Sequence, residues 1–233
     1  LGLLTVKGVS ENCVTEMIAE REREPFRSLE DFRQRTRFDR RQLRQLAAVG
    51  AINDYSLTRR QSLWEVEEET WEQGELFAET TSHVPAVAEC PLPEMNYGER
   101  IQADFAGMGL TAGKHPMALI RPRLPKENST AMDLKKLPHG ASASTAGAVI
   151  CRQRPGTAKG VVFITLEAET GLSNRIVYAA RFEDYRLTIT TEPFLRITGK
   201  VQQAEGTTHL MAEEIEPLQT PSDLPAAASH DFH

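Results

Sequence analysis

The sequence predicts an α+β multidomain chain, in which a small helical domain is joined by a partly helical linker to a five-stranded β-barrel. Three observations lead to this prediction. Apolar residues recur at helical spacing in residues 1–72, this periodicity is lost in residues 73–138, and apolar and polar residues alternate in residues 139–217. Residues 218–233 are expected to form a C-terminal tail. A chain of 233 residues is long enough for two such domains and their linker.

The helical domain is expected to contain several short helices. Ser10 stands before apolar residues spaced by three and four, so we expect it to cap a first helix. Ser28 begins a second candidate helix. Arg40–Val49 carries apolar residues at helical spacing and is followed by a glycine, which is typical of a helix end. Thr58–Trp71 is a further helical candidate.

A change of composition predicts the linker. Residues 73–138 contain Pro85, Pro91 and Pro93 among small and acidic side chains, a mixture that does not sustain a regular element. A helix is expected to resume at Tyr97–Met108. The linker is therefore expected to be only partly helical.

Five segments with a period of two predict the barrel. A helix is expected between the third and the fourth segment, at Ala180–Leu187. Five strands with a helix in that place have the element order of the OB-fold. The segments are Ala143–Gln153, Lys159–Glu167, Leu172–Ala179, Phe194–Gln202 and Thr207–Ile215.

The charge is unevenly distributed along the chain. The net charge is −6, but residues 1–61 carry +3 and residues 106–200 carry +7, whereas residues 62–105 carry −10. Because the position of charge decides which partner a surface attracts, the negative total does not exclude a polyanionic partner. Two basic blocks are expected, separated by an acidic belt.

Composition also indicates the cellular compartment in which the protein is expected. Three scattered cysteines, Cys13, Cys90 and Cys151, argue against a disulfide framework and a zinc site, and fit a reducing cytoplasm. No apolar run approaches the ~20 residues that span a bilayer, so no membrane partner is expected. The chain begins with Leu1 instead of methionine, so we expect a fragment of a longer protein.

The first candidate DNA-binding motif is the sequence Lys7-Gly8-Val9-Ser10. A glycine turn before a helix directs backbone N–H groups outward, and such groups suit a phosphate. The pattern resembles a helix-hairpin-helix motif with Ser10 at the place of its second glycine. The alternative is an ordinary packing corner between two helices.

The second candidate motif lies between the first two predicted strands. Arg152, Arg154, Thr157 and Lys159 place three cations and a hydroxyl on one loop, and this loop binds oligonucleotides in OB-folds. Phe163 follows on the face of the second strand opposite to the predicted core, where it could stack on a base. The alternatives are an exposed polar turn and a phenylalanine that packs under a loop.

The third candidate motif, Gln73–Phe77, resembles the short peptide signature with which bacterial replication proteins dock on the sliding clamp. Gln73, Leu76 and Phe77 stand where helical periodicity ends, and a short peptide of this pattern could place two apolar anchors in a preformed pocket. The alternative is that Leu76 and Phe77 pack on the helical domain. No catalytic residue, metal site or cofactor is expected in this chain, because phosphoryl transfer needs clustered carboxylates around Mg²⁺ and no Asp-x-Asp pair is present.

Several segments together resemble one protein family. Arg152–Gly171 is similar to the OB region of the error-prone branch of DnaE-type bacterial DNA polymerases, within the polymerase III alpha-subunit family. Four other segments show the same resemblance, in the same order along the chain. These segments are Leu1–Ile18, Cys90–Pro93, Gly113–Met117 and Asp231–His233. The chain departs from the family pattern at Ser10, at Ala168, where an acid is expected, and at Arg175, where an apolar residue is expected.

The resemblance implies a non-catalytic C-terminal segment of an error-prone polymerase that acts in translesion synthesis and DNA repair. It implies that the helical domain grips duplex DNA and that the barrel holds the single-stranded template. The sliding clamp and accessory mutagenesis proteins are its implied protein partners, and Mg²⁺ is required only by the parent nucleotidyltransferase. Two alternatives stay open, a stand-alone single-stranded nucleic-acid-binding accessory protein and a protein-docking adaptor without DNA contact.

Overall fold

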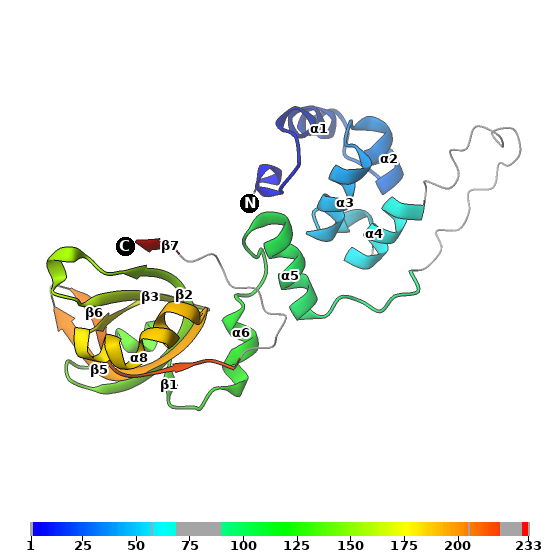
Figure 1. Ribbon diagram of the computed structural model, residues 1–233. Coiled ribbons are helices and arrows are strands. Elements are labelled where there is room, and N and C mark those ends of the chain that lie inside the picture. The colour runs from blue at the N-terminus through cyan, green and yellow to red at the C-terminus, as the bar shows by residue number, and fades with distance from the viewer. Residues whose placement is uncertain (1, 57, 69–89, 205, 220–229, 233) are drawn as a thin grey trace, which may run out of the picture. The chain divides into compact units, whose positions relative to one another are not determined.

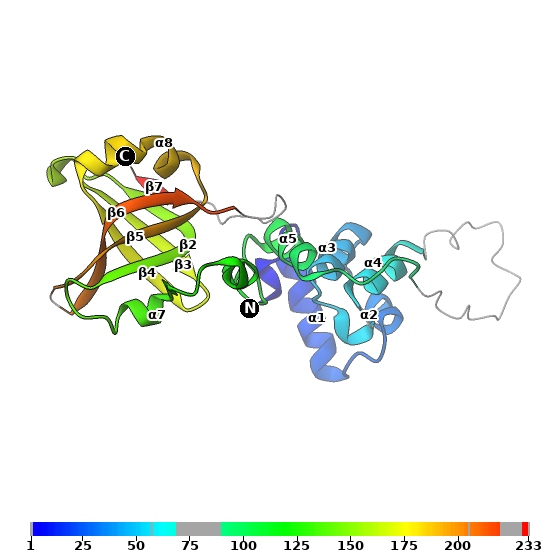
Figure 2. The same cartoon turned by 90° about the horizontal axis from the view of Figure 1, so that it is seen from below.

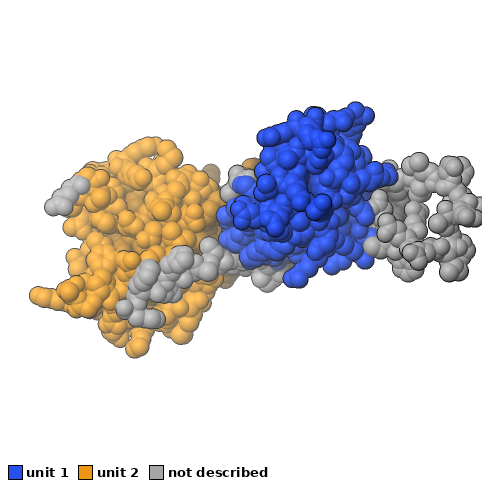
Figure 3. All heavy atoms as spheres, turned by 90° about the horizontal axis from the view of Figure 1, so that it is seen from above, with its two compact units in different colours: residues 1–112 blue, residues 113–233 orange. Residues whose placement is uncertain are grey.

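The computed structural model describes residues 2–56, 58–68, 90–204, 206–219 and 230–232. The chain divides into two compact units, Leu1–Ala112 and Gly113–His233, which are coloured separately in Figure 3. The first unit is helical and the second is built around a β-barrel. This confirms the predicted fold class.

The helical unit contains five α-helices and two short 3₁₀ turns among its described residues (Figure 1). Its core is formed by apolar side chains from all of these helices, with Leu46 and Ala47 fully buried. The helices are α1 (Glu11–Arg23), α2 (Leu29–Arg35), α3 (Arg40–Ala48), α4 (Arg59–Glu68) and α5 (Tyr97–Met108).

Local sequence signals explain where the helices begin and end. The Ser28 hydroxyl accepts a hydrogen bond from the Asp31 N–H group, which confirms the expected cap of α2. Asp39 and Gln42 form a reciprocal capping box at the start of α3. Gly50 follows α3 with a φ of 77°, a left-handed conformation that ends a helix readily at glycine.

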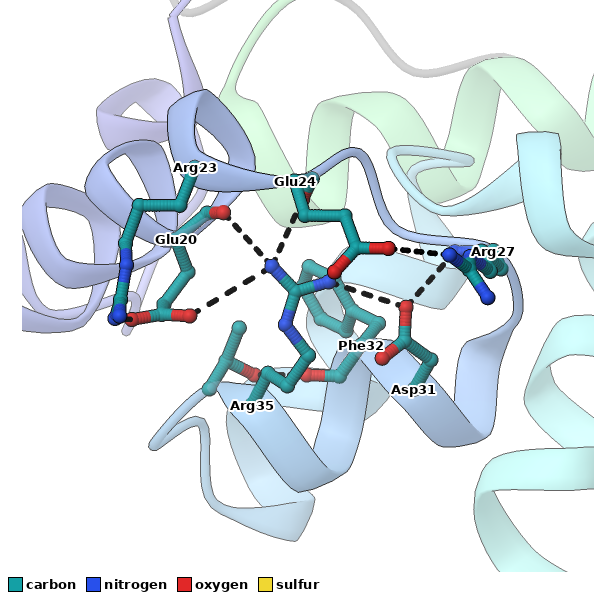
Figure 4. Close-up of polar contacts among 8 residues, drawn as sticks. Glu20, Arg23, Glu24, Arg27, Asp31, Phe32 and Arg35 are labelled. Atoms are coloured by element: carbon teal, nitrogen blue, oxygen red, sulfur yellow. Dashed lines mark hydrogen bonds and ion pairs between the residues drawn. The ribbon is translucent and has the colours of Figure 1, made fainter.

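Arg35 holds the end of α1 against α2, as Figure 4 shows. Its guanidinium donates to the Glu20 and Glu24 carbonyl oxygens at 2.8 Å each, and also to the Asp31 carboxylate at 3.2 Å. It stacks over the Phe26 ring, with 4.6 Å between the guanidinium carbon and the ring centre. Helix C-terminal carbonyls lack partners within their own helix, so a cation there is both a hydrogen-bond donor and a favourable charge.

Helix α5 belongs to the helical unit, although we expected it in the linker. The Arg59 guanidinium on α4 donates to the Asp104 carboxylate on α5 at 2.7 Å, and the Asp104 side chain is only 2% exposed. The Thr111 hydroxyl donates to the other Asp104 oxygen at 2.9 Å. The residues of the predicted linker, 73–138, therefore divide: those described up to Ala112 lie in the helical unit, and those from Gly113 lie in the barrel unit.

The barrel closes because its first long strand pairs on both sides. Strand β2 pairs with β3 on one side and with β5 on the other, and the remaining order is β3-β4-β6-β5. This is the strand order of the OB-fold, with α8 (Ala179–Thr191) between the third and the fourth barrel strand. The barrel strands are β2 (Ser142–Gln153), β3 (Val162–Ala168), β4 (Gly171–Val177), β5 (Phe194–Ala204) and β6 (Thr207–Pro217).

Shorter elements cover the barrel. Figure 2 shows α7 (Ala131–Leu134) and α8 on opposite sides of it. Helix α6 (Met117–Ile120) packs its apolar residues against the small outward side chains of β2. The parallel strands β1 (Asn128–Ser129) and β7 (His230–Phe232) each pair with part of β2. The segment after α6 is held to the barrel by Arg121, whose guanidinium contacts both oxygens of Glu169 at 2.5 and 3.2 Å.

The alternation of residues in β3 confirms its predicted faces. Val162, Ile164 and Leu166 are buried in the barrel, at 3%, 0% and 0% exposure, whereas Phe163 lies on the outer face. The strand begins three residues later than we expected, because the chain turns at Lys159 and Gly160, both with a positive φ, directly after the 3₁₀ turn Gly156–Ala158. At Gly199 a Cβ atom would lie 1.9 Å from the Met211 carbonyl oxygen, so only glycine permits this approach of β5 to β6.

Arg175 points into the barrel core, where we expected an apolar residue. It is 0% exposed, and its guanidinium donates to the hydroxyl of Thr145, to the hydroxyl of Ser173 at 2.9 Å and to the Asn174 carbonyl at 3.0 Å. No carboxylate is among the partners seen in the described residues. Burial lowers the pKa of Arg175 to about 9, because the charged form is poorly solvated there.

We expect Arg175→Met to stabilise the barrel by about 1–4 kcal/mol at neutral pH, because it removes a buried charge and keeps a similar volume. The folded chain loses the Arg175 proton near pH 9, whereas the unfolded chain keeps it to higher pH. The penalty is therefore complete below about pH 9 and falls above it, so the advantage of the variant should shrink progressively as the pH rises above about 9. Calorimetric melting measures both effects. Arg196→Met is the control, since Arg196 is paired with Glu216 and partly exposed; a gain of equal size there would contradict the explanation.

Candidate nucleic-acid interface

The loop between β2 and β3 carries the cations that the sequence singled out, but the structure gives them different positions. Thr157 and Lys159 are exposed, and Lys159 has a φ of 49°, which turns the chain sharply before β3. Arg154 and Lys159 are therefore the cations of this loop that face solvent, whereas Arg152 is partly buried.

Arg152 is directed to the end of α8. Its Nε–H group donates to the Ile189 carbonyl at 2.5 Å, and its Nη2 group donates to the Glu192 carbonyl at 2.7 Å. The side chain thus binds the carbonyl groups that end α8, in the same way as Arg35 binds those of α1. This position differs from the outward phosphate contact that we expected for Arg152.

Arg154 lies over an aromatic ring beside the loop. Its guanidinium carbon is 4.6 Å from the centre of the Phe182 ring, and its Nη2 atom is 3.9 Å from a carboxylate oxygen of Glu183. The side chain is still 48% exposed. An exposed ion pair of this length is weak, so the guanidinium can exchange Glu183 for another anion at little cost.

Phe163 lies half-buried on the outer face of β3. Its neighbours in the sheet register are Gln153 on β2 and Ile176 on β4. The next outward residue of β3 is Thr165, whose hydroxyl lies 3.1 Å from the Asn174 side-chain oxygen. One outer face of the barrel therefore combines an aromatic ring with hydrogen-bonding groups, next to the loop that holds Arg154.

A groove of about 600 Å³ opens beside β4, and the sequence alone did not reveal it. It lies between α7, β4 and the hairpin that joins β5 to β6, so it borders the strands and the loop with which OB-folds bind oligonucleotides. Its side chains are mostly small or polar, and Lys135 is its cation. The lining residues are Ala131, Leu134, Lys135, Leu172, Ser173, Asn174, Gln203, Ala204, Gly206, Thr207 and Thr208.

The hairpin in the helical unit has the expected left-handed glycine, Gly8, with a φ of 80°. Ser10 is the N-cap residue of α1 but its side chain makes no capping hydrogen bond. Lys7 contacts the end of α5: its N–H group donates to the Gly107 carbonyl at 2.8 Å, and its ammonium donates to the Ala106 carbonyl at 3.0 Å. Lys7 and Gly8 remain exposed, and Val9 is half-buried.

The other sequence expectations concern clamp docking, metals and membranes. Gln73, Leu76 and Phe77 lie outside the described residues. In the described part of the chain, no three His, Cys, Asp or Glu side chains are grouped so that they could hold a metal ion. No helix found there is long and apolar enough to cross a membrane.

The two curated relatives named below are of one kind, and a family model matches the start of the chain. A family model described as a helix-hairpin-helix motif matches residues 1–62. The error-prone DNA polymerase of Alkalilimnicola ehrlichii is 36% identical over 100% of this chain, and that of Methylococcus capsulatus is 37% identical over 100%. The chain spans about a fifth of the length of these relatives, 22% in both cases, and the matched part is their C-terminal region.

Similarities to solved structures are lower. An asparaginyl-tRNA synthetase from Pyrococcus horikoshii is 20% identical with a TM-score of 0.36, over 43% of this chain and 24% of the synthetase. An OBody bound to hen egg-white lysozyme is 15% identical with a TM-score of 0.34, over 42% of this chain and 96% of its own. No functional conclusion follows from similarity at this level.

We expect Arg152→Ala to lower the free energy of unfolding of the barrel by about 1.5–3 kcal/mol, because hydrogen bonds from a charged donor to the end of α8 are lost. Arg154→Ala should change it by less than about 1 kcal/mol, since that side chain is exposed and weakly paired. Thermal or urea unfolding of both variants measures the difference. Equal stability of the two variants would contradict the helix-capping role of Arg152.

Proposed function

We propose, on the premise that this chain is homologous to the C-terminal region of error-prone DNA polymerases, that it is a non-catalytic DNA-binding segment of such a polymerase. The parent protein would be a cytoplasmic DNA-directed nucleotidyltransferase acting in translesion synthesis and DNA repair. Its catalytic domains would lie outside this chain and would require Mg²⁺. The observation that carries the proposal is sequence similarity along the whole chain, together with the two modules that it folds into.

The barrel would hold the single-stranded template. The exposed cations Arg154 and Lys159 stand beside the outer face that carries Phe163. Non-specific binding of a single strand combines cations that follow the phosphates with aromatic rings on which bases stack. The groove beside β4 extends this face with hydrogen-bonding side chains, including Asn174. Thr157 would add a hydroxyl donor on the same loop.

The helical unit would contact duplex DNA through its hairpin. Gly8 allows the sharp turn, and the backbone N–H groups from Ser10 into the first turn of α1 would face a phosphate, whereas the Val9 N–H group donates to the Val6 carbonyl. Lys7 would add its charge at the edge of this contact while its ammonium stays near the end of α5.

We expect weak, sequence-independent binding of single-stranded DNA that falls with salt. Replacing both Arg154 and Lys159 by Ala should flatten the slope of log affinity against log salt by about 1.4, since each phosphate contact to a single strand contributes about 0.7. Fluorescence anisotropy with an oligothymidine across a salt series measures the slope. Arg123→Ala with Lys126→Ala is the matched control, because both residues are exposed cations of the barrel unit outside this loop. If both double variants behaved alike, the loop would not be a specific contact.

We also propose that Gln73, Leu76 and Phe77 dock on the sliding clamp, with accessory mutagenesis proteins as further partners. The motivation is the spacing of Gln and the Leu-Phe pair in a short peptide with two apolar anchors. Micromolar docking, about −8 kcal/mol, would be enough to keep a tethered polymerase near the primer end.

Replacing Leu76 and Phe77 together by Ala separates docking from packing. Docking predicts that clamp binding, measured by surface plasmon resonance, is lost while the melting temperature is unchanged. Intramolecular packing predicts a lower melting temperature instead, because two buried large apolar side chains contribute roughly 1.5–3 kcal/mol each. An unaltered parent chain that does not bind the clamp at all would refute docking.

A further inference from the structure

The helical unit uses several of its cations internally. Residues 1–61 contain 12 lysines and arginines. Lys7 and Arg35 contact helix ends, and Arg59 and Arg60 are paired with Asp104 and Glu99. Exposed arginines lie in two places, towards the end of α1 and at α3, and α3 begins with two consecutive arginines.

The solvent side of α3 is lined by arginine. Leu43, Leu46 and Ala47 are buried in the core, which places Arg40, Arg41 and Arg44 on the opposite side of the helix. The side chains of Arg40 and Arg44 are 46% and 48% exposed, and Arg41 is exposed.

Two of these arginines share one carboxylate. Glu67 stands near the end of α4, which lies beside α3 (Figure 1), and one of its oxygens contacts Arg40 while the other contacts the Arg44 Nε–H group at 2.5 Å. The hydrogen bond from Arg44, together with that from Arg40, lowers the pKa of Glu67 despite its partial burial. Two guanidinium groups around one carboxylate leave one positive charge in excess, and the same arrangement suits the oxygens of a phosphate.

Arg37 extends this surface towards the hairpin. Its side chain is 82% exposed and lies 3.4 Å from the Glu16 carboxylate on α1. Its carbonyl oxygen accepts a hydrogen bond from the Cys13 thiol at 3.5 Å, so the residue lies next to the first turn of α1. The arginine surface and the glycine hairpin therefore border the same helix start.

We propose that Arg37, Arg40, Arg41 and Arg44 form a phosphate-contact surface for duplex DNA, on which the Glu67 carboxylate occupies the position of a backbone phosphate. This inference rests on the proposed DNA-binding function and goes beyond it, because it names a surface outside the hairpin and gives Glu67 a role as an internal competitor. DNA would displace Glu67 from Arg40 and Arg44 and bind the same two guanidinium groups.

The chemistry of the surface favours duplex DNA. Arginine binds phosphate through two parallel N–H groups, and contacts to the backbone position a duplex without reading its sequence. Binding of a single strand depends on aromatic stacking, and the sequence of α3 contains no aromatic residue.

The decisive variant is Glu67→Gln in the full chain. It removes the competing charge and keeps the shape, so we expect affinity for a short random-sequence duplex to increase roughly threefold or more. Arg40→Gln with Arg44→Gln should weaken duplex binding and flatten the salt slope by about 1.8, since each phosphate contact to duplex DNA contributes about 0.9. A purely structural role of Glu67 predicts only a lower melting temperature, without tighter DNA binding.

The control and the outcomes separate this inference from the proposed function. Arg21→Gln with Arg23→Gln removes two exposed cations from α1 and should leave the slope nearly unchanged. The α3 surface is not the contact if Glu67→Gln does not tighten duplex binding, or if the two double variants flatten the slope equally. In that case, single-strand binding by the barrel would still support the proposed function. If the unaltered chain binds neither form of DNA, both fail.

Discussion

Within each unit, cations bind the carbonyl groups at the ends of helices and so fix these helices to other segments of the same unit. Lys7 binds the end of α5, Arg35 the end of α1 and Arg152 the end of α8. The last carbonyl groups of a helix have no partner within it, and they carry the negative end of the helix dipole. Each cation comes from another part of the chain, so each contact joins a helix end to a distant segment. The positions of the hairpin, the α1–α2 corner and α8 follow from these contacts.

The same contacts reduce the number of cations that are available to contact DNA. Counted along the sequence, residues 106–200 carry a net charge of +7, but one of those charges caps α8 and another, Arg175, is enclosed in the barrel. Charge that is already hydrogen-bonded inside a unit adds to the long-range field but does not release counterions from a phosphate. A local charge count therefore indicates the sign of a surface, but it does not identify the residues that contact a ligand.

Much of the fold could be predicted because it depends on local patterns. Alternation of apolar residues identified the barrel strands and the outward face of Phe163, and Ser28 marked a helix start. The groups that a long side chain contacts could not be predicted from these patterns. Arg152 and Arg154 stand two residues apart in one loop, and only the position of α8 decides that one caps a helix while the other lies over Phe182. That α5 belongs to the helical unit likewise depends on a buried pair between residues far apart in the sequence, Arg59 with Asp104.

That buried pair has a mechanical consequence. The first residue described after Glu68 is Cys90, whose N–H group donates to the Gln61 side-chain oxygen on α4 at 2.8 Å. The described residues on both sides of this part of the chain are thus held on α4, and the Arg59–Asp104 pair fixes α5 to the same helix. A force applied to a partner bound at Gln73–Phe77 would therefore reach α4 and α5 first, and would reach the barrel through the backbone at residues 112–113 only where the barrel is itself held.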